Sequence, residues 1–197
     1  MEDDIPVKII ILGEANVGKS CILQRYLTGE YTESQANTVG AKFLSKRVQH
    51  QNKNLKLNIW DTAGQERYQS FSKMYCRDAK AVILVYDLAS PESIEGMMRW
   101  YKIMSQETLP SDTLLFVAGS KSDIGSYTEE IRKQIEDFCL ETRSEHFLVS
   151  AKEGVGIEEL FMKIVSKFCK SIFAAKQSIV LSNSSHVQKK VKKRRFC

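Results

Sequence analysis

A glycine-rich segment near the N-terminus has the residue types and the spacing needed to bind phosphate. Residues 13–20 read Gly-Glu-Ala-Asn-Val-Gly-Lys-Ser, which matches GxxxxGK[ST], between an apolar run at 7–12 and an amphipathic stretch. In that order the backbone N–H groups at a helix start face a phosphate, where the helix dipole favours negative charge. Lys19 adds a point charge for the β- and γ-phosphates, and the Ser20 hydroxyl is a ligand for Mg²⁺. This segment, the P-loop, therefore predicts a nucleoside-triphosphate site.

A second group of chemically useful residues lies in Asp61-Thr62-Ala63-Gly64-Gln65-Glu66-Arg67, directly after a predicted strand. A carboxylate at the C-terminal end of a strand points toward the crevice where open α/β sheets bind ligands. We expect Asp61 to hold Mg²⁺ through water, Gly64 to let the backbone approach the γ-phosphate, and Gln65 to orient the attacking water. Asp-x-x-Gly alone is common in turns, but here it follows the P-loop lysine by 42 residues.

Short apolar runs that alternate with longer amphipathic ones must position these groups. We expect strands at 7–12, 42–49, 55–60, 81–87, 114–119 and 147–150, with a hairpin turn at 51–54. Helices are predicted at 20–27, 91–107, 128–142 and 157–173, with start signals at Pro91 and Thr128. This alternation predicts an α/β fold of the P-loop NTPase class. It has a mostly parallel six-stranded sheet, one antiparallel edge strand and helices on both faces.

The charge of the 197-residue chain is unevenly distributed. Of its 29 Lys and Arg residues, seven lie at 176–197, where there is no Asp or Glu, so residues 1–175 carry −2 of the net +5. With 43% hydrophobic residues, a wholly disordered chain is excluded. We therefore expect a nucleotide-binding domain at 1–175 and a flexible basic tail at 176–197.

The cysteines and the lengths of the apolar runs indicate in which cellular compartment the chain is expected. The five cysteines form no CxxC pair, which argues against a zinc site or disulfide framework and favours reduced thiols in the cytosol. The N-terminus lacks the basic and apolar pattern of a secretory signal, and no apolar run approaches the ~18–20 residues that span a bilayer.

Three more motifs occur later in the chain: Asn37-Thr38-Val39-Gly40, Gly119-Ser120-Lys121-Ser122-Asp123 and Ser150-Ala151-Lys152. Together with the P-loop and residues 61–67 they form a set that resembles the Ras superfamily of small GTPases, and specifically its Rab branch. The features similar to the Rab branch are the sequences at 39–43, 56–60, 67–70, 75–79 and 84–87. The resemblance covers about residues 7–173. It implies the small G protein fold, a monomer, and a GTP/GDP switch that hydrolyses GTP to GDP with Mg²⁺ as cofactor. Such switches regulate vesicle-mediated membrane trafficking by recruiting effectors.

The resemblance also assigns roles to individual residues. Gln65 is the catalytic residue, Tyr31 packs on the guanine edge, and Mg²⁺ is held by Ser20 and Thr38 directly and by Asp61 through water. The implied nucleotide-binding residues are Ala15, Asn16, Val17, Gly18, Lys19, Ser20, Cys21, Tyr31, Thr38, Asp61, Gly64, Ser120, Lys121, Asp123, Ser150, Ala151 and Lys152.

The base preference follows from hydrogen bonding. The Asp123 carboxylate offers two acceptors to the N1–H and N2–H₂ donors of guanine, whereas adenine would leave it unpaired at a cost of ~1–3 kcal/mol. We expect the Lys121 stem to cover the ring and the Ala151 N–H to meet the guanine oxygen. An ATPase or nucleoside kinase is the alternative, which nucleotide competition distinguishes.

Three residues depart from the family pattern. Ser120 stands where the family usually has Asn, so we expect weaker nucleotide binding and faster exchange. Ala15 and Asn16 crowd the γ-phosphate entrance, which predicts slow intrinsic turnover. These residues leave open a second alternative, a nucleotide-dependent binding module with little catalysis.

Partners follow from the same resemblance. Phe43, Trp60 and Tyr75 match the effector-facing aromatic triad of the Rab branch, with core packing as the other interpretation of Trp60. The implied protein partners are effectors, an exchange factor, a GAP, and a GDP-dissociation inhibitor or escort protein.

The tail ending Lys-Lys-Val-Lys-Lys-Arg-Arg-Phe-Cys at 189–197 has three interpretations. A nuclear-localisation or nucleic-acid patch and a solubilising tail are two of them. The resemblance favours the third, prenylation of Cys197, because one lipid and a polybasic patch together anchor stably. The fourth residue from the end is Arg194, so there is no CaaX box. We expect no nucleic-acid partner and a peripheral place on the cytosolic face of an intracellular membrane; the switch sequence resembles endosomal members.

Overall fold

The computed structural model describes residues 4–33, 38, 40–64, 75–105 and 109–173. Its centre is a six-stranded sheet in the order β2-β3-β1-β4-β5-β6. The β2–β3 pair is antiparallel, and the other neighbours are parallel. In chain order the strands are β1 (Ile5–Leu12), β2 (Ala41–His50), β3 (Lys53–Thr62), β4 (Ala81–Asp87), β5 (Leu114–Ser120) and β6 (Glu145–Leu148). The predicted sheet, including its single antiparallel edge strand, is confirmed.

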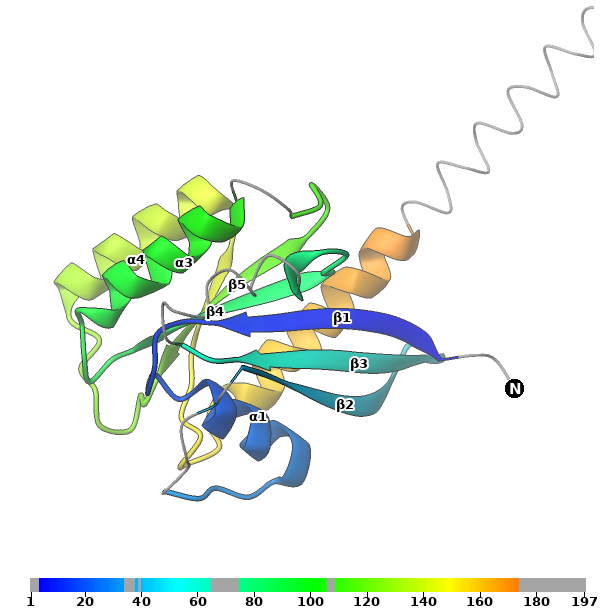
Figure 1. The fold of residues 1–197 in the computed structure, drawn as a ribbon, viewed down its shortest axis with the longest axis horizontal. Helices are drawn as coiled ribbons and strands as arrows, with labels where there is room; N and C mark the ends of the chain where they lie inside the picture. Colours follow the sequence, from blue (N-terminus) through cyan, green and yellow to red (C-terminus); the bar gives the residue numbers. More distant parts are fainter. Residues whose placement is uncertain (1–3, 34–37, 39, 65–74, 106–108, 174–197) are drawn as a thin grey trace, which may run out of the picture.

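Helices cover both faces of this sheet (Figure 1). α1 (Lys19–Thr28) and the helix at 157–173 pack on one face, and α3 (Ser93–Ser105) and α4 (Glu129–Thr142) pack on the other. The alternation of side chains along a strand explains how one sheet serves two cores. In β1, Ile9 and Ile11 belong to the core under α1, while Ile10 belongs to the core under α3 and α4.

Several predicted boundaries differ from the observed ones by one or two residues, among them the start of β1 and both ends of β3. Two further differences have a local explanation. The last strand is Glu145–Leu148 rather than 147–150. As an edge strand it is open to solvent on one side, so it accommodates the polar Glu145 and His146, which an apolar-run criterion passes over. α3 begins at Ser93 rather than Pro91, because the Ser93 side chain folds back and bonds the backbone N–H of Asp87 at 2.8 Å.

Helix ends follow local chemistry. Gly18 adopts φ 92 before α1, and Gly29 ends that helix with φ 76. Thr128 caps α4 as predicted, its side chain accepting a hydrogen bond from the Ile131 N–H at 3.4 Å. No helix in the described ranges is long and apolar enough to cross a membrane. The boundary predicted at 175/176 and the basic tail fall outside those ranges.

A histidine and two tyrosines form a cluster between β4, β6 and the loop before α4. Tyr86 is fully buried, and its hydroxyl lies 3.0 Å from Nε2 of His146. The Tyr127 hydroxyl lies 3.4 Å from Nδ1 of the same ring, and both tyrosine rings stack on it. Burial lowers the pKa of His146 to about 4.

Candidate nucleotide site

The P-loop connects the end of β1 to the start of α1. Gly13 has φ 150, and a Cβ there would lie 2.3 Å from the Val85 carbonyl oxygen, so only glycine allows this turn to pass β4. The Lys19 ammonium donates to the carbonyls of Gly13 at 3.0 Å and Glu14 at 2.6 Å. These two hydrogen bonds fold the Lys19 side chain back onto the P-loop and hold its ammonium group there.

Lys19 is one of the few buried charged groups, with 6% of its surface exposed. Burial lowers its pKa to about 8, although the negative charges of Asp61 and Glu14 act to raise it. A lysine desolvated in this way gains most from an anion brought next to it. The loop is therefore built to receive a strongly negative group.

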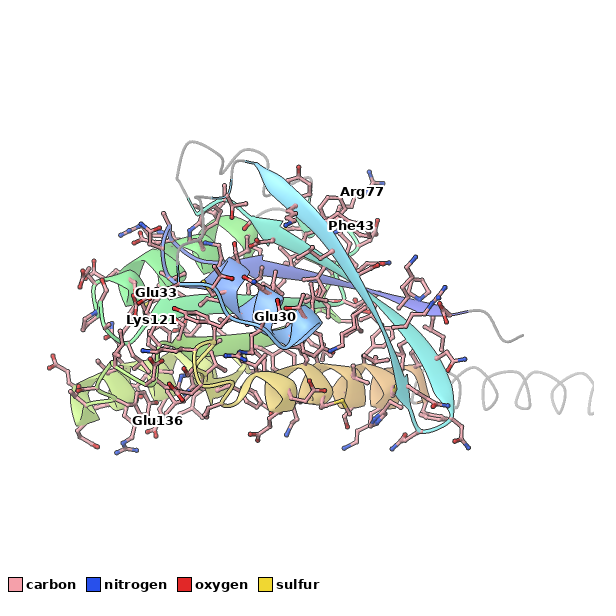
Figure 2. The ribbon with its side chains drawn as sticks, turned by 90° about the horizontal axis from the view of Figure 1, so that it is seen from below. Glu30, Glu33, Phe43, Arg77, Lys121 and Glu136 are labelled. Carbon is pink, nitrogen blue, oxygen red and sulfur yellow. The ribbon has the colours of Figure 1, made fainter. Side chains whose placement is uncertain are left out.

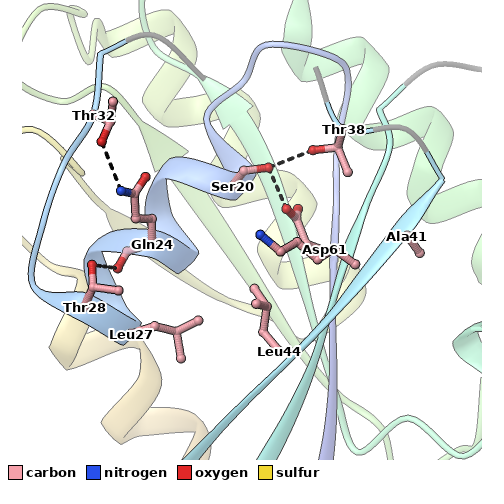
Figure 3. A pocket seen from close by; sticks show the side chains of 10 residues that line it. Ser20, Gln24, Leu27, Thr28, Thr32, Thr38, Ala41, Leu44 and Asp61 are labelled. Atoms are coloured by element: carbon pink, nitrogen blue, oxygen red, sulfur yellow. Dashed lines mark hydrogen bonds between the residues drawn. The ribbon is translucent and has the colours of Figure 1, made fainter. Parts of the chain in front are cut away.

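Side-chain oxygens of Ser20, Thr38 and Asp61 meet at the start of α1 (Figure 3). The Ser20 hydroxyl donates to Oδ2 of Asp61 at 2.6 Å and lies 2.9 Å from the Thr38 hydroxyl. The other Asp61 oxygen, Oδ1, is buried and has no hydrogen-bond partner among the described residues. Burial raises the pKa of Asp61, while the Ser20 hydrogen bond and the Lys19 charge lower it. Hydroxyl and carboxylate oxygens with one acceptor unsatisfied are the donor set that Mg²⁺ takes, so the residues fit that ion.

The segment after β3 closes against the P-loop. A Cβ on Gly64 would lie 2.2–2.3 Å from backbone atoms of Glu14 and Ala15, so a side chain there would displace the loop. The Ala63 N–H donates to the Gly40 carbonyl at 2.7 Å, which joins this segment to the residues before β2. Gln65, the predicted catalytic residue, lies outside the described residues.

Ala15 and Asn16 are exposed on the outside of the P-loop. Asn16 has φ 64, a left-handed conformation that asparagine tolerates better than most residues. Val17 is buried, and its carbonyl accepts a hydrogen bond from the Ser120 hydroxyl at 2.5 Å. The Ser120 hydroxyl thus joins the end of β5 to the P-loop.

A cavity of about 200 Å³ lies next to the P-loop, between α1 and the loops that follow β5 and β6. Glu33 and Lys121 lie close together at this cavity in Figure 2. The predicted nucleotide-binding residues that line it are Gly18, Cys21, Tyr31, Ser120, Lys121, Asp123, Ala151 and Lys152.

Two polar pairs fix the loops around the cavity. Oδ1 of Asp123 accepts a hydrogen bond from the Ser150 hydroxyl at 2.6 Å. The Lys121 ammonium, from a backbone with φ 57, pairs with Oδ2 of the buried Asp87 at 2.6 Å. These contacts orient one carboxylate and one lysine at the same opening. The described residues of the five sequence motifs thus meet at the C-terminal ends of the parallel strands.

The comparisons with known proteins agree with this geometry. A family model of the Ras family matches residues 8–170. The chain belongs to the Ras family. Human Ras-related protein Rab-30 is 35% identical over 187 residues, which cover 94% of this chain and 90% of the human protein. From Dictyostelium discoideum, Ras-related protein Rab-1C is 36% identical over 86% of this chain and 84% of its own length, and Ras-related protein Rab-5A is 35% identical over 83% and 81%.

Within the Ras family the chain is a divergent Rab-family small GTPase. It is therefore an enzyme of the class that hydrolyses GTP, in a branch that acts in membrane trafficking. The confirmed fold is that of a P-loop small G protein.

The three aromatic residues that resemble the Rab effector triad lie next to one another. The Phe43 and Trp60 rings have centroids 5.2 Å apart in an edge-on arrangement, and those of Trp60 and Tyr75 are 4.9 Å apart. Phe43 is 50% exposed on edge strand β2, on the opposite side of the molecule from Glu136 of α4 (Figure 2). Trp60 and Tyr75 are half-buried, and Tyr75 packs against the core under α3 and α4, so the row runs from the exposed Phe43 to the edge of that core.

Sequence reasoning missed several residues that hold this Rab-family site together. Asp87 could have been found, because it ends the fully buried strand β4, and Asp61 stands at the comparable place, next to last in β3. The pair formed by Glu14 and Arg99, 2.5 Å apart, joins the P-loop to α3 across 85 residues, and no local signal announces it. Arg25 bonds the Ala151 carbonyl, more than 120 residues away, and no local sequence signal indicates this contact either.

Proposed function

We propose that the protein is a guanine-nucleotide switch that binds GTP and GDP in the P-loop and the adjoining cavity. The observation that carries the proposal is the hydrogen bond from Ser120 to the Val17 carbonyl, which joins the phosphate-binding and base-binding loops. A buried lysine stands on one side of this link and an oriented aspartate on the other. One nucleotide can therefore reach both.

At the base end, selectivity comes from the loops after β5 and β6. Asp123 would accept from N1–H and N2–H₂ of guanine, since the Ser150 hydroxyl fixes its carboxylate. The Ala151 N–H would meet the guanine oxygen, and Tyr31 at the cavity edge would pack on the ring. Adenine offers no pair of donors to the carboxylate, so it would leave those two acceptors without the hydrogen bonds that guanine supplies.

At the phosphate end, Lys19 would pair with the β- and γ-phosphates, whose charge offsets its desolvation. Ser20 and Thr38 would hold Mg²⁺ through their hydroxyls, and Asp61 would hold it through water. When bound, the ion neutralises charge on the phosphates. In the hydrolytic step Gln65 would orient the attacking water.

The switch itself would depend on segments that touch the γ-phosphate. Thr38 comes from the chain before β2 and Gly64 from the chain after β3, and the Ala63–Gly40 hydrogen bond couples them. A γ-phosphate would hold both segments in place, and its loss would release them. In the aromatic row, Phe43 lies on β2 and Trp60 on β3, the strands that these segments adjoin, and Tyr75 contacts Trp60, so the row would present the state to effectors.

Regulators and membrane attachment complete the proposal. We expect an exchange factor, a GAP and a GDP-dissociation inhibitor or escort protein as partners, with a prenyl group on Cys197 at the cytosolic face of an intracellular membrane. Mass spectrometry of the protein from its native host tests the lipid, and an unmodified Cys197 would refute it.

A single-turnover assay tests the central proposal. Purified protein is loaded with radiolabelled GTP and Mg²⁺, and bound GTP and GDP are followed over time with ATP and XTP as competitors. We expect slow conversion to GDP and no displacement by ATP. Asp123→Asn is the matched variant: its amide replaces one acceptor by a donor, so preference should move toward XTP, which carries a carbonyl where guanine has N2–H₂. Equal competition by ATP would make the protein a different P-loop enzyme.

A further inference from the structure

Arg25 is bonded to three backbone carbonyls from two parts of the chain. It lies in the last turn of α1, and its Nε donates to the Ala151 carbonyl at 2.6 Å. One terminal nitrogen donates to the Gly29 carbonyl at 2.6 Å, and the other donates to the carbonyl of Lys152. The backbone carbonyl of Arg25 also accepts the Gly29 N–H that ends the helix.

Besides Arg25, the loop is held by the packing of Ala151 against the core under α1 and by hydrogen bonds of Ser150. The Ser150 hydroxyl bonds Asp123 on one side, and the Ser150 N–H bonds the Val155 carbonyl within the loop. Gly154, with positive φ, lies between Ser150 and Val155, and Gly156, also with positive φ, follows directly. Inside the turn the Glu153 N–H donates to the Ser150 hydroxyl at 3.1 Å. Arg25 fixes the carbonyl side of residue 151, while Ser150 fixes the residue before it. Together they set the direction of the Ala151 N–H.

We propose that Arg25 is a positioning residue that sets the dwell time of guanine nucleotides by holding the Ala151 N–H on the guanine oxygen. This inference rests on the proposed function, because it assumes a guanine base in the cavity. The planar guanidinium gives each carbonyl its own N–H in a fixed direction, which a lysine cannot do. Since Arg25 is on the same helix as Lys19 and Ser20, it also connects the base loop to the phosphate loop.

The test compares nucleotide release from Arg25 variants. GDP and 6-thio-GDP are chosen because sulfur at position 6 is a weaker acceptor, while N1–H and N2–H₂ stay the same. We expect Arg25→Ala to speed GDP release about tenfold or more, the size typical of losing hydrogen bonds from a charged group, and to speed 6-thio-GDP release much less. Arg25→Lys should be intermediate, because one ammonium can reach one carbonyl. It also serves if the alanine variant folds poorly.

Arg132→Ala is the matched control. Arg132 lies on α4 and makes two exposed ion pairs, with Glu129 and Glu136, away from the cavity. Its removal should leave both release rates unchanged. If Arg25→Ala and Arg25→Lys release GDP at the wild-type rate, or release both nucleotides faster by one factor, Arg25 only supports the fold and the inference is wrong. Wild-type protein that retains no GDP would instead overturn the proposed function.

Discussion

The cluster of Tyr86, His146 and Tyr127 predicts a loss of stability in mild acid. Either tyrosine hydroxyl can donate or accept, so hydrogen bonding alone permits both forms of the imidazole. Burial favours the neutral imidazole over the protonated one, and it lowers the pKa of His146 from 6.5 to about 4. The unfolded chain therefore binds the proton more tightly than the folded one. The stabilisation is present above pH 6.5 and is lost as the pH falls toward 4.

The size of the effect follows from these two values. One pKa unit corresponds to about 1.4 kcal/mol, so the full difference amounts to roughly 3 kcal/mol once the pH is well below 4. Between pH 7 and pH 5 the folded ring stays neutral while the unfolded ring becomes protonated. The free energy of unfolding should fall by about 2 kcal/mol over that interval from this residue alone.

Urea unfolding at pH 7 and pH 5 measures this difference. His146→Gln keeps a hydrogen-bonding side chain next to Tyr86 and cannot titrate, so its loss of stability on acidification should be about 2 kcal/mol smaller than that of the wild type. Carboxylates titrate in both proteins and cancel in the comparison. His50→Gln, at the far end of β2, is the control and should retain the full pH dependence. An equal pH dependence in the wild type and His146→Gln would refute the reasoning.

Three further predictions concern the nucleotide. Ser120→Asn should slow GDP release about fivefold in a fluorescent-nucleotide exchange assay, because the Ser120 hydroxyl is already bonded to Val17 and asparagine adds a donor worth ~1 kcal/mol; no slowing would contradict this. Gln65→Leu should lower single-turnover hydrolysis about tenfold or more without loss of GTP binding, and unchanged turnover would remove Gln65 from the mechanism. Chelating Mg²⁺ should speed GDP release from the wild type, since Oδ1 of Asp61 has no partner among the described residues to replace the ion; an unchanged rate would argue against a metal there.

Most of the fold was predictable because its signals are local. Continuous apolar runs marked β1, β4 and β5, which are buried on both faces, and alternation marked the β2–β3 hairpin. The edge strand β6 was misplaced because one open side weakens the apolar signal. Strand order itself was anticipated only through the resemblance, since pairing in a parallel sheet depends on contacts far apart in sequence.

The residues of the candidate site also divide into those with a local sequence signal and those without one. Residues within contiguous motifs, such as Lys19, Asp61 and Asp123, were recognisable from type and spacing. Arg25 and Arg99 were not, because each acts on backbone or a partner brought near only by folding. The role expected of Ser120 needed the structure for a third reason. The sequence shows only that serine replaces asparagine at position 120. It does not show that the Ser120 hydroxyl reaches the Val17 carbonyl.

The β2–β3 ladder has a consequence for how the domain presents itself. One end pairs Ala41 with Thr62, beside the P-loop, and the other pairs His50 with Lys53. Ten residues of strand separate these ends by roughly 30 Å. The Lys53 ammonium lies 3.6 Å from the ring centroid of Phe173, the last described residue, so the chain leaves the domain at the end away from the nucleotide loops. If the protein were tethered through its C-terminus, the end of the domain at His50 and Lys53 would thus face the membrane. The nucleotide loops at the other end would be open to partners that arrive from solution.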